Sequence, residues 1–198
     1  MKAAKNININ FQDQLLPLVS NGIHQVQSSP SDGTTVIIKF TTGRITIWNE
    51  DTKAPKEEGK PHSDPIMMIR FNPSGSRMIT SDLTGTIGVW RGINLLAVYQ
   101  KEWAITHCVF SDIQLEGAKG NLGNLFLFAG RSGTVCLAND MNMCSDVCRV
   151  GGTIKALMFY QKEGSAIVIT SNLLLVQFKI NFTEKSVPEK KVKLSISG

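Results

Sequence analysis

Apolar and polar residues alternate along much of the chain in runs of about five to eight positions, with Pro, Gly, Asn or Asp between the runs. In an extended strand Ile87 and Val89 share one face, and Gly88 lies on the other. Ile45 and Ile47 share a face in the same way. This alternation is typical of half-buried strands, and no long segment shows a helical period. The pattern predicts an all-β protein.

One short strand recurs four times, each time after a turn: TTGRITIW, LTGTIGVW, RSGTVCLA and SNLLLVQF. Taking Gly43, Gly85, Gly133 and Leu173 as equivalent turn residues gives intervals of 42, 48 and 40 residues. A period of about 40 to 45 residues is typical of the four-stranded blades of a β-propeller. We therefore expect four units of four antiparallel strands each.

A second repeated feature supports this assignment. An apolar run ending in Phe precedes the repeated strand in three units, closing at Phe71, Phe110 and Phe159. From this Phe to the turn residue there are 14 residues in the second and fourth units, and 23 in the third. The third unit therefore carries an insertion of about nine residues, and the Gly-rich, polar segment 111–123 is expected to be an exposed, mobile loop.

These spacings also set the expected boundaries. Residues 1–22 lie outside the repeat, and the four units cover about 23–61, 62–103, 104–151 and 152–198. The outermost strands are expected at 95–100, 146–150 and 193–197, and Trp48, Trp90 and Phe178 at corresponding ends of the third strands. Propellers typically close with about four to eight blades. Four blades of this length rarely close alone, so we expect a partial propeller with open ends.

The second unit resembles a WD40 repeat. It has His62 four residues before its first strand, the turn NPSG, the turn SDLTGT and a strand-final Trp90. The unit departs from the pattern because Arg91 follows Trp90, where the repeat has Asp, and because Thr84 stands at the acidic turn position. The resemblance implies a hydrogen-bond network around such a repeat, of which we expect His62 and Thr80 to keep a part.

Over about 33–198 the chain is similar to the N-terminal WD40 region of the 140-kDa-class subunit of intraflagellar transport complex A. The similarity is carried by the ordered run HSDPIMMIRFNPSGSRMITSDLTGTIGVWR, ITHCVF, LFLFAGRSGTV, TIKALMFYQKEGSAIVITSNLLL and KKVKLSISG. It implies a non-catalytic subunit in retrograde ciliary transport and cilium assembly, located at the axoneme and ciliary base. The implied partners are the other complex A subunits and ciliary cargo proteins.

Composition and the start of the sequence lead us to expect a cytoplasmic protein. The chain is 42% hydrophobic and 19% charged, starts without the apolar core of a signal peptide and has no stretch long enough for a membrane helix. We expect no membrane insertion. Its net charge of +5 is spread along the chain, and the one cluster, EKKVK at 189–193, contains an acid. Aromatic and basic residues are not interleaved, so we expect no specific nucleic-acid binding, although weak contact with an acidic surface stays open.

The residues that could carry chemistry do not form a recognised site. Cys136, Cys144 and Cys148, with His107 or Cys108, contain a CxxxC spacing that could bind zinc, but paired CxxC motifs are absent. Buried or loop thiols are the preferred interpretation. We therefore predict no catalytic, cofactor-binding or metal-binding residues.

Two further motifs are equally weak. No nucleophile motif accompanies the histidines His24, His62 and His107, and GAKGNLG at 117–123 lacks the order of a phosphate-binding loop. Two alternatives to the transport subunit stay open. One is a WD40 scaffold of another cytosolic complex, such as a vesicle coat, and the other is a small β-rich enzyme, which would require a converging polar pocket.

Overall fold

The computed structural model describes the strands in residues 23–58 and the ranges 61–92, 94–111, 124–180 and 188–194. These parts of the chain contain sixteen strands and one short 3-10 turn, Gln161–Glu163. The predicted all-β class is therefore confirmed. The predicted extension 1–22, most of the predicted loop 111–123 and the side chain of His24 lie outside the described residues.

The strands form four antiparallel sheets, each made of four strands that follow one another in the chain. The first sheet contains β1 (Ile23–Ser28), β2 (Thr34–Lys39), β3 (Ile45–Asn49) and β4 (Ala54–Glu58). The second contains β5 (Ile66–Phe71), β6 (Met78–Asp82), β7 (Thr86–Arg91) and β8 (Asn94–Gln100). The third contains β9 (Ile105–Phe110), β10 (Phe126–Gly130), β11 (Thr134–Ala138) and β12 (Cys144–Arg149). The fourth contains β13 (Ile154–Tyr160), β14 (Ser165–Thr170), β15 (Leu174–Lys179) and β16 (Pro188–Lys193).

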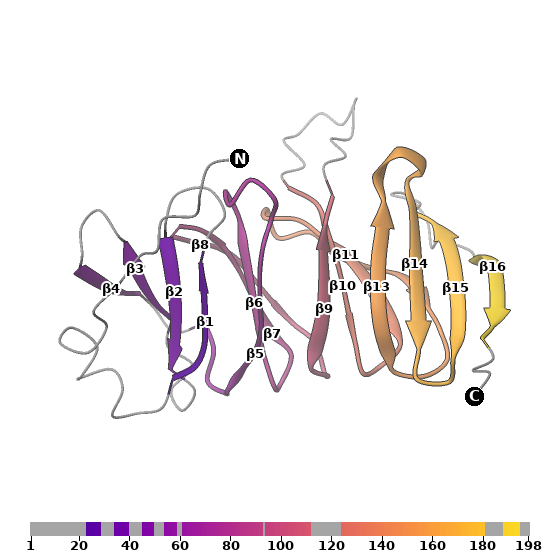
Figure 1. The fold of residues 1–198 in the computed structure, drawn as a ribbon, viewed down its shortest axis with the longest axis horizontal. Coiled ribbons are helices and arrows are strands. Elements are labelled where there is room, and N and C mark those ends of the chain that lie inside the picture. The colour runs from indigo at the N-terminus through magenta and orange to yellow at the C-terminus, as the bar shows by residue number, and fades with distance from the viewer. Residues whose placement is uncertain are drawn as a thin grey trace, which may run out of the picture.

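The sheets follow one another along the long axis of the molecule in chain order, from indigo to yellow (Figure 1). The first strands of the second, third and fourth sheets are neighbours, since β9 contacts both β5 and β13. Each of the two inner sheets therefore presents one face to the sheet before it and the other to the sheet after it.

Apolar side chains fill the spaces between sheets. Ile45 of the first sheet packs with Ile66, Ile69, Met78 and Trp90 of the second. A larger cluster joins the second sheet to the third, and another joins the third to the fourth. Because residues alternate between the two faces of a strand, each inner sheet contributes to two of these layers.

The turn residue of the repeat has the same backbone conformation in the three sheets where it is described. Gly85, Gly133 and Leu173 have φ angles of 95°, 75° and 58°. Each carbonyl accepts a hydrogen bond from the first residue after the fourth strand of its sheet, at 3.0, 2.8 and 2.7 Å respectively. Trp48, Trp90 and Phe178 each stand one residue before the end of the third strand, as the repeat predicted.

One expected strand was wrong. The outermost strand of the fourth sheet was predicted at 193–197, but β16 is Pro188–Lys193. The amide of Leu194 bonds to the carbonyl of Leu173, and Lys193 lies opposite Leu174, so pairing with β15 ends there. The alternation of apolar residues after Lys193 did not indicate the strand. The hydrogen bond from Leu194 to the turn residue Leu173 sets which residues of β16 pair with β15.

Candidate functional site

A buried hydrogen-bond network joins His62 to the second and third strands of the second sheet. Nε2 of His62 lies 2.6 Å from Oγ1 of Thr80, and the indole Nε1 of Trp90 donates to the same hydroxyl at 2.9 Å. On its other side, Nδ1 of His62 lies 3.0 Å from Oδ2 of Asp82. All four residues are at most 1% exposed. The network therefore ties the segment before β5 to β6 and β7.

The donors and acceptors of this network fix the protonation state of His62. The Thr80 hydroxyl receives the Trp90 proton and has a single proton of its own, for which Nε2 of His62 at 2.6 Å and the Gly88 carbonyl oxygen at 3.5 Å are the two acceptors; the much shorter contact assigns it to Nε2. Nδ1 therefore carries the imidazole proton and donates it to Asp82. Burial lowers the pKa of His62, and although the Asp82 carboxylate opposes this shift, the ring stays neutral. A neutral histidine enclosed in this way has a structural role.

Asp82 is the acidic member that sequence reasoning missed. The WD40 pattern has an acidic residue two positions before Thr86, where this chain has Thr84. Asp82, the last residue of β6, provides the carboxylate of the network in its place. One carboxylate oxygen accepts hydrogen bonds from the amides of Thr84 and Thr86 at 3.0 and 2.8 Å and from the Thr84 hydroxyl at 3.0 Å. Burial tends to raise the pKa of Asp82, but the hydrogen bonds from Thr86, His62 and Thr84 together lower it.

The third and fourth sheets cannot form this network. Thr80 is equivalent by the repeat to Phe128 in the third sheet and Val168 in the fourth, and both are buried apolar residues. Among the second, third and fourth sheets, the polar network is thus confined to the second. Apolar packing takes its place in the third and fourth sheets.

A buried ion pair joins the second sheet to the third. Nε of Arg77 lies 2.6 Å from Oδ2 of Asp140, and their side chains are 9% and 5% exposed. Asn124 donates to the same carboxylate from its amide and its side chain, at 3.0 and 3.1 Å. Asn72 holds the backbone of Arg77 by accepting its amide proton at 2.9 Å. This joint was not visible in the sequence because the two charges are 63 positions apart.

A second polar joint lies between the same sheets. Nζ of Lys101, just after β8, lies 3.0 Å from Oδ1 of Asp146 on β12. The same oxygen accepts a hydrogen bond from the thiol of Cys136 at 3.1 Å. The Lys101 ammonium also lies 5.9 Å from the ring centroids of Trp103 and Phe128. Burial tends to lower the pKa of Lys101, but the hydrogen bond to Asp146 and the other acidic groups nearby raise it. The amine therefore stays protonated.

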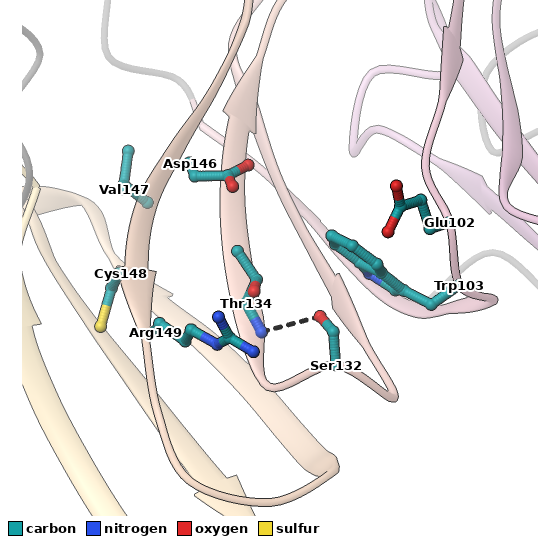
Figure 2. A pocket seen from close by; sticks show the side chains of 8 residues that line it. All are labelled: Glu102, Trp103, Ser132, Thr134, Asp146, Val147, Cys148 and Arg149. Atoms are coloured by element: carbon teal, nitrogen blue, oxygen red, sulfur yellow. Dashed lines mark hydrogen bonds between the residues drawn. The ribbon is translucent and has the colours of Figure 1, made fainter.

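A cleft of about 400 Å³ opens beside this joint (Figure 2). Glu102 and Trp103 line it from the connection between β8 and β9, and the third sheet supplies the opposite wall: Ser132, Thr134, Asp146, Val147, Cys148 and Arg149. The indole N–H of Trp103 is buried and has no hydrogen-bond acceptor among the described residues. The sulfur of Cys148 lies on the side of β12 away from Trp103 (Figure 2). This wall therefore does not present a thiol beside a base to a molecule in the cleft.

The sequence candidates for a metal site are divided among several places. Cys136 and Cys144 belong to the apolar layer that faces the second sheet, whereas Cys148 belongs to the layer that faces the fourth. Cys108 is buried in the former layer. His107 is held by Thr106 at 2.8 Å and by the carbonyl of Lys155 at 2.9 Å. Within the described ranges, no three His, Cys, Asp or Glu side chains are arranged to hold a metal ion.

No protein-family model matches the chain. In the parts of the chain with described structure, no helix has the length and apolar character required to cross a bilayer. The phosphate-loop candidate at 117–123 lies outside these parts, whereas the cluster at 189–193 falls within β16.

Proposed function

We propose that the chain is a non-catalytic protein-interaction scaffold whose four sheets are consecutive blades of a partial WD40-type β-propeller. Each sheet is an antiparallel meander of strands adjacent in sequence, and the first strands of the second, third and fourth sheets lie side by side. The network of His62, Thr80, Asp82 and Trp90 supports the same assignment, because the WD40 resemblance implied such a network in the second unit.

The observation that carries a binding role is the outer face of the fourth sheet. The comparison uses two positions of the repeat, six residues before its turn residue and two residues after it. In the second sheet these positions hold Ile79 and Ile87, which are both 0% exposed because the third sheet covers them. The third sheet has Leu127 and Val135, 1% and 0% exposed, under the fourth. The fourth sheet has apolar residues at both positions as well, but they are only half-buried.

These residues are Ile167 and Leu175, and they belong to a larger apolar face. Ile169 lies opposite Leu175, which in turn lies opposite Val192, and Met158 lies opposite Ile167. Met158 and Val192 are 44% and 38% exposed. Because buried apolar area contributes about 25 cal/mol per Å², a row of this kind favours a packed neighbour. We assign this face to contact with another sheet of the same assembly or with a partner subunit.

The resemblance to the complex A subunit suggests in which assembly this scaffold acts. The proposed partners are the other subunits of intraflagellar transport complex A and ciliary cargo proteins, and the proposed process is retrograde transport and cilium assembly. The long ordered run of similar segments supports this assignment over a scaffold of unrelated function.

Affinity purification from ciliated cells tests the proposal. The tagged chain is expected to recover complex A subunits, and Ile167→Lys with Leu175→Lys is expected to reduce that recovery by at least about tenfold, since two charges would be buried at the contact. Leu83→Lys, the same kind of change at an exposed leucine in the β6–β7 turn of the second sheet, serves as the control. Recovery of vesicle-coat proteins in place of ciliary ones would favour the alternative scaffold. Equal recovery by all variants would reject the face as a binding surface.

A further inference from the structure

Two thiols of the third sheet lie together at its joint with the second sheet. Cys136 is on β11, opposite Asp146, and Cys144 is the first residue of β12, opposite Ala138. The two cysteines are thus diagonal neighbours across one pair of strands, on the face that packs against the second sheet. Cys136 is completely buried, whereas Cys144 is partly open to solvent.

A charged pair completes the cluster. Oδ1 of Asp146 accepts the Cys136 thiol at 3.1 Å and lies 3.0 Å from Nζ of Lys101, which comes from the other side of the joint. We propose that Cys136 and Cys144 are a redox-active dithiol that hydroperoxides oxidise to a disulfide between β11 and β12. This site is independent of the proposed scaffold function.

The environment makes Cys144 the attacking thiol. The Cys136 thiol has one proton, which it donates to Asp146 while Cys144 is protonated and to the Cys144 sulfur once that sulfur is a thiolate. The hydrogen bond to Cys144 is the main reason that the pKa of the Cys144 thiol is lowered to about 7; burial opposes this shift, and the Lys101 ammonium reinforces it. The same hydrogen bond, together with burial and Asp146, raises the pKa of Cys136. Near neutral pH the pair therefore holds one thiolate, on the more exposed sulfur, and one thiol.

The reaction takes place in two steps. The Cys144 thiolate attacks one peroxide oxygen, the O–O bond breaks, and the departing hydroxide takes up a proton to form water, leaving a sulfenic acid on Cys144. Cys136 then gives up its proton and its sulfur attacks the Cys144 sulfur, displacing hydroxide, which combines with that proton as a second water. Two thiols and one hydrogen peroxide thus become one disulfide and two waters.

The fold allows the sulfurs to approach and links the reaction to the joint. Cys144 is the first residue of β12, directly after a turn that the Asn139 side chain holds by accepting the amides of Met141 and Met143, so the sulfurs approach by rotation of the two side chains on their shared face. Oxidation removes the S–H that donates to Asp146. The Asp146 carboxylate then loses its contact with Cys136 beside Lys101, at the junction between the second and third sheets.

Two other cysteines provide matched controls. Cys148 is four residues further along β12, but it packs on the opposite face, and burial raises its pKa. Cys108 lies in the same layer as the pair, and burial raises its pKa as well. Neither is expected to react with peroxide at the rate of Cys144.

The test is peptide mapping of the purified chain after treatment with stoichiometric hydrogen peroxide, with alkylation of the remaining thiols. The expected product is a peptide pair cross-linked through Cys136 and Cys144, which thiol reductants reverse. Cys148→Ala should still form the cross-link. Cys136→Ser, which keeps a hydrogen-bond donor beside Cys144 but cannot form the disulfide, should instead accumulate a sulfenic acid on Cys144 that dimedone traps.

Alkylation of the untreated chain gives a second readout that needs no variant. Between pH 6 and 8 the rate at Cys144 should rise only about tenfold, whereas a thiol with an ordinary pKa should rise about 90-fold, because the thiolate fraction sets the rate. A 90-fold rise at Cys144 would overturn the proposal. So would peroxide treatment that leaves Cys136 reduced while Cys144 is oxidised further, or that modifies Cys148 first.

Discussion

Leu173 holds the backbone conformation that Gly133 holds one sheet earlier. Their φ angles are 58° and 75°, and their carbonyls accept the amides of Leu194 and Val150 at 2.7 and 2.8 Å. The left-handed region costs a residue with a side chain roughly 1 to 2 kcal/mol. The turn is therefore maintained at Leu173 against the local preference of that residue. The left-handed conformation places the Leu173 carbonyl so that it accepts the hydrogen bond from Leu194 at the edge of the sheet.

Replacing Gly133 tests how much this turn contributes to stability. A Cβ at that position would lie 2.3 Å from the Val150 carbonyl oxygen. Gly133→Ala is expected to lower the free energy of unfolding by about 2 kcal/mol or more, as strain adds to the steric conflict. Urea denaturation followed by circular dichroism measures it. Gly164→Ala, with a φ of 60° but open space around it, isolates the strain, and Gly151→Ala, also in open space, is expected to be neutral.

The spacing of the repeat predicted much of the fold. It identified Leu173 as the equivalent of Gly133 although the residue types differ, because the interval of 40 residues and the apolar strand that follows are independent of the turn residue. It also predicted the all-β class and the four-stranded antiparallel units. Position in a repeat survives substitutions that remove a motif.

The site was less predictable, because local irregularities decide which side chains meet. Cys144 and Cys148 are four apart and would share a face in a regular strand. A bulge opposite Val135 and Cys136 leaves Val147 unpaired and moves Cys148 to the opposite face. Sequence spacing therefore grouped three cysteines that the fold separates. The acid of the His62 network was missed for a similar reason, since Asp82 reaches its turn from the end of a strand.

Removing the shared hydroxyl should weaken the His62 network as a unit. Thr80→Val keeps the shape but leaves the indole N–H of Trp90 and Nε2 of His62 without their partner. Each buried polar group left unpaired costs about 1 to 3 kcal/mol, so we expect a loss of about 3 kcal/mol in the free energy of unfolding. Thr153→Val, at a partly exposed hydroxyl with a long 3.4 Å contact, should change it by less than about 0.5 kcal/mol. Similar losses at both sites would show that the hydroxyl of Thr80 is not specially important.

The ion pair between Arg77 and Asp140 is suited to a double-mutant cycle. Arg77→Met alone leaves a buried carboxylate whose remaining partner among the described residues is Asn124, and Asp140→Asn leaves a buried guanidinium without its negative partner. Either change is expected to cost about 3 kcal/mol, whereas the double variant should cost less than the sum by at least about 1 kcal/mol. Thermal and urea unfolding of the four proteins provide the cycle. Additive losses would mean that the two charges stabilise the chain independently.

The stability of the chain should fall as the pH drops below 6.5, and His62 should account for part of this fall. Burial lowers the pKa of His62 in the folded chain below its ordinary value of 6.5. Between these two pKa values the unfolded chain binds a proton at His62 that the folded chain does not bind. The stabilising contribution is therefore fully present above 6.5 and is lost as the pH falls toward the folded pKa.

Urea denaturation at pH 7.5, 6.5 and 5.5 measures this dependence. His62→Gln should be less stable at pH 7.5 but should lose less stability between pH 7.5 and 5.5 than the unmodified chain. His107→Gln is the control, since burial lowers the pKa of His107 in the same direction but its ring is only partly enclosed. Asp82 is expected to act only at lower pH, because its folded pKa is below 3.8. A chain that gained stability on acidification through His62 would instead hold a protonated imidazole paired with Asp82, and the neutral network would be wrong.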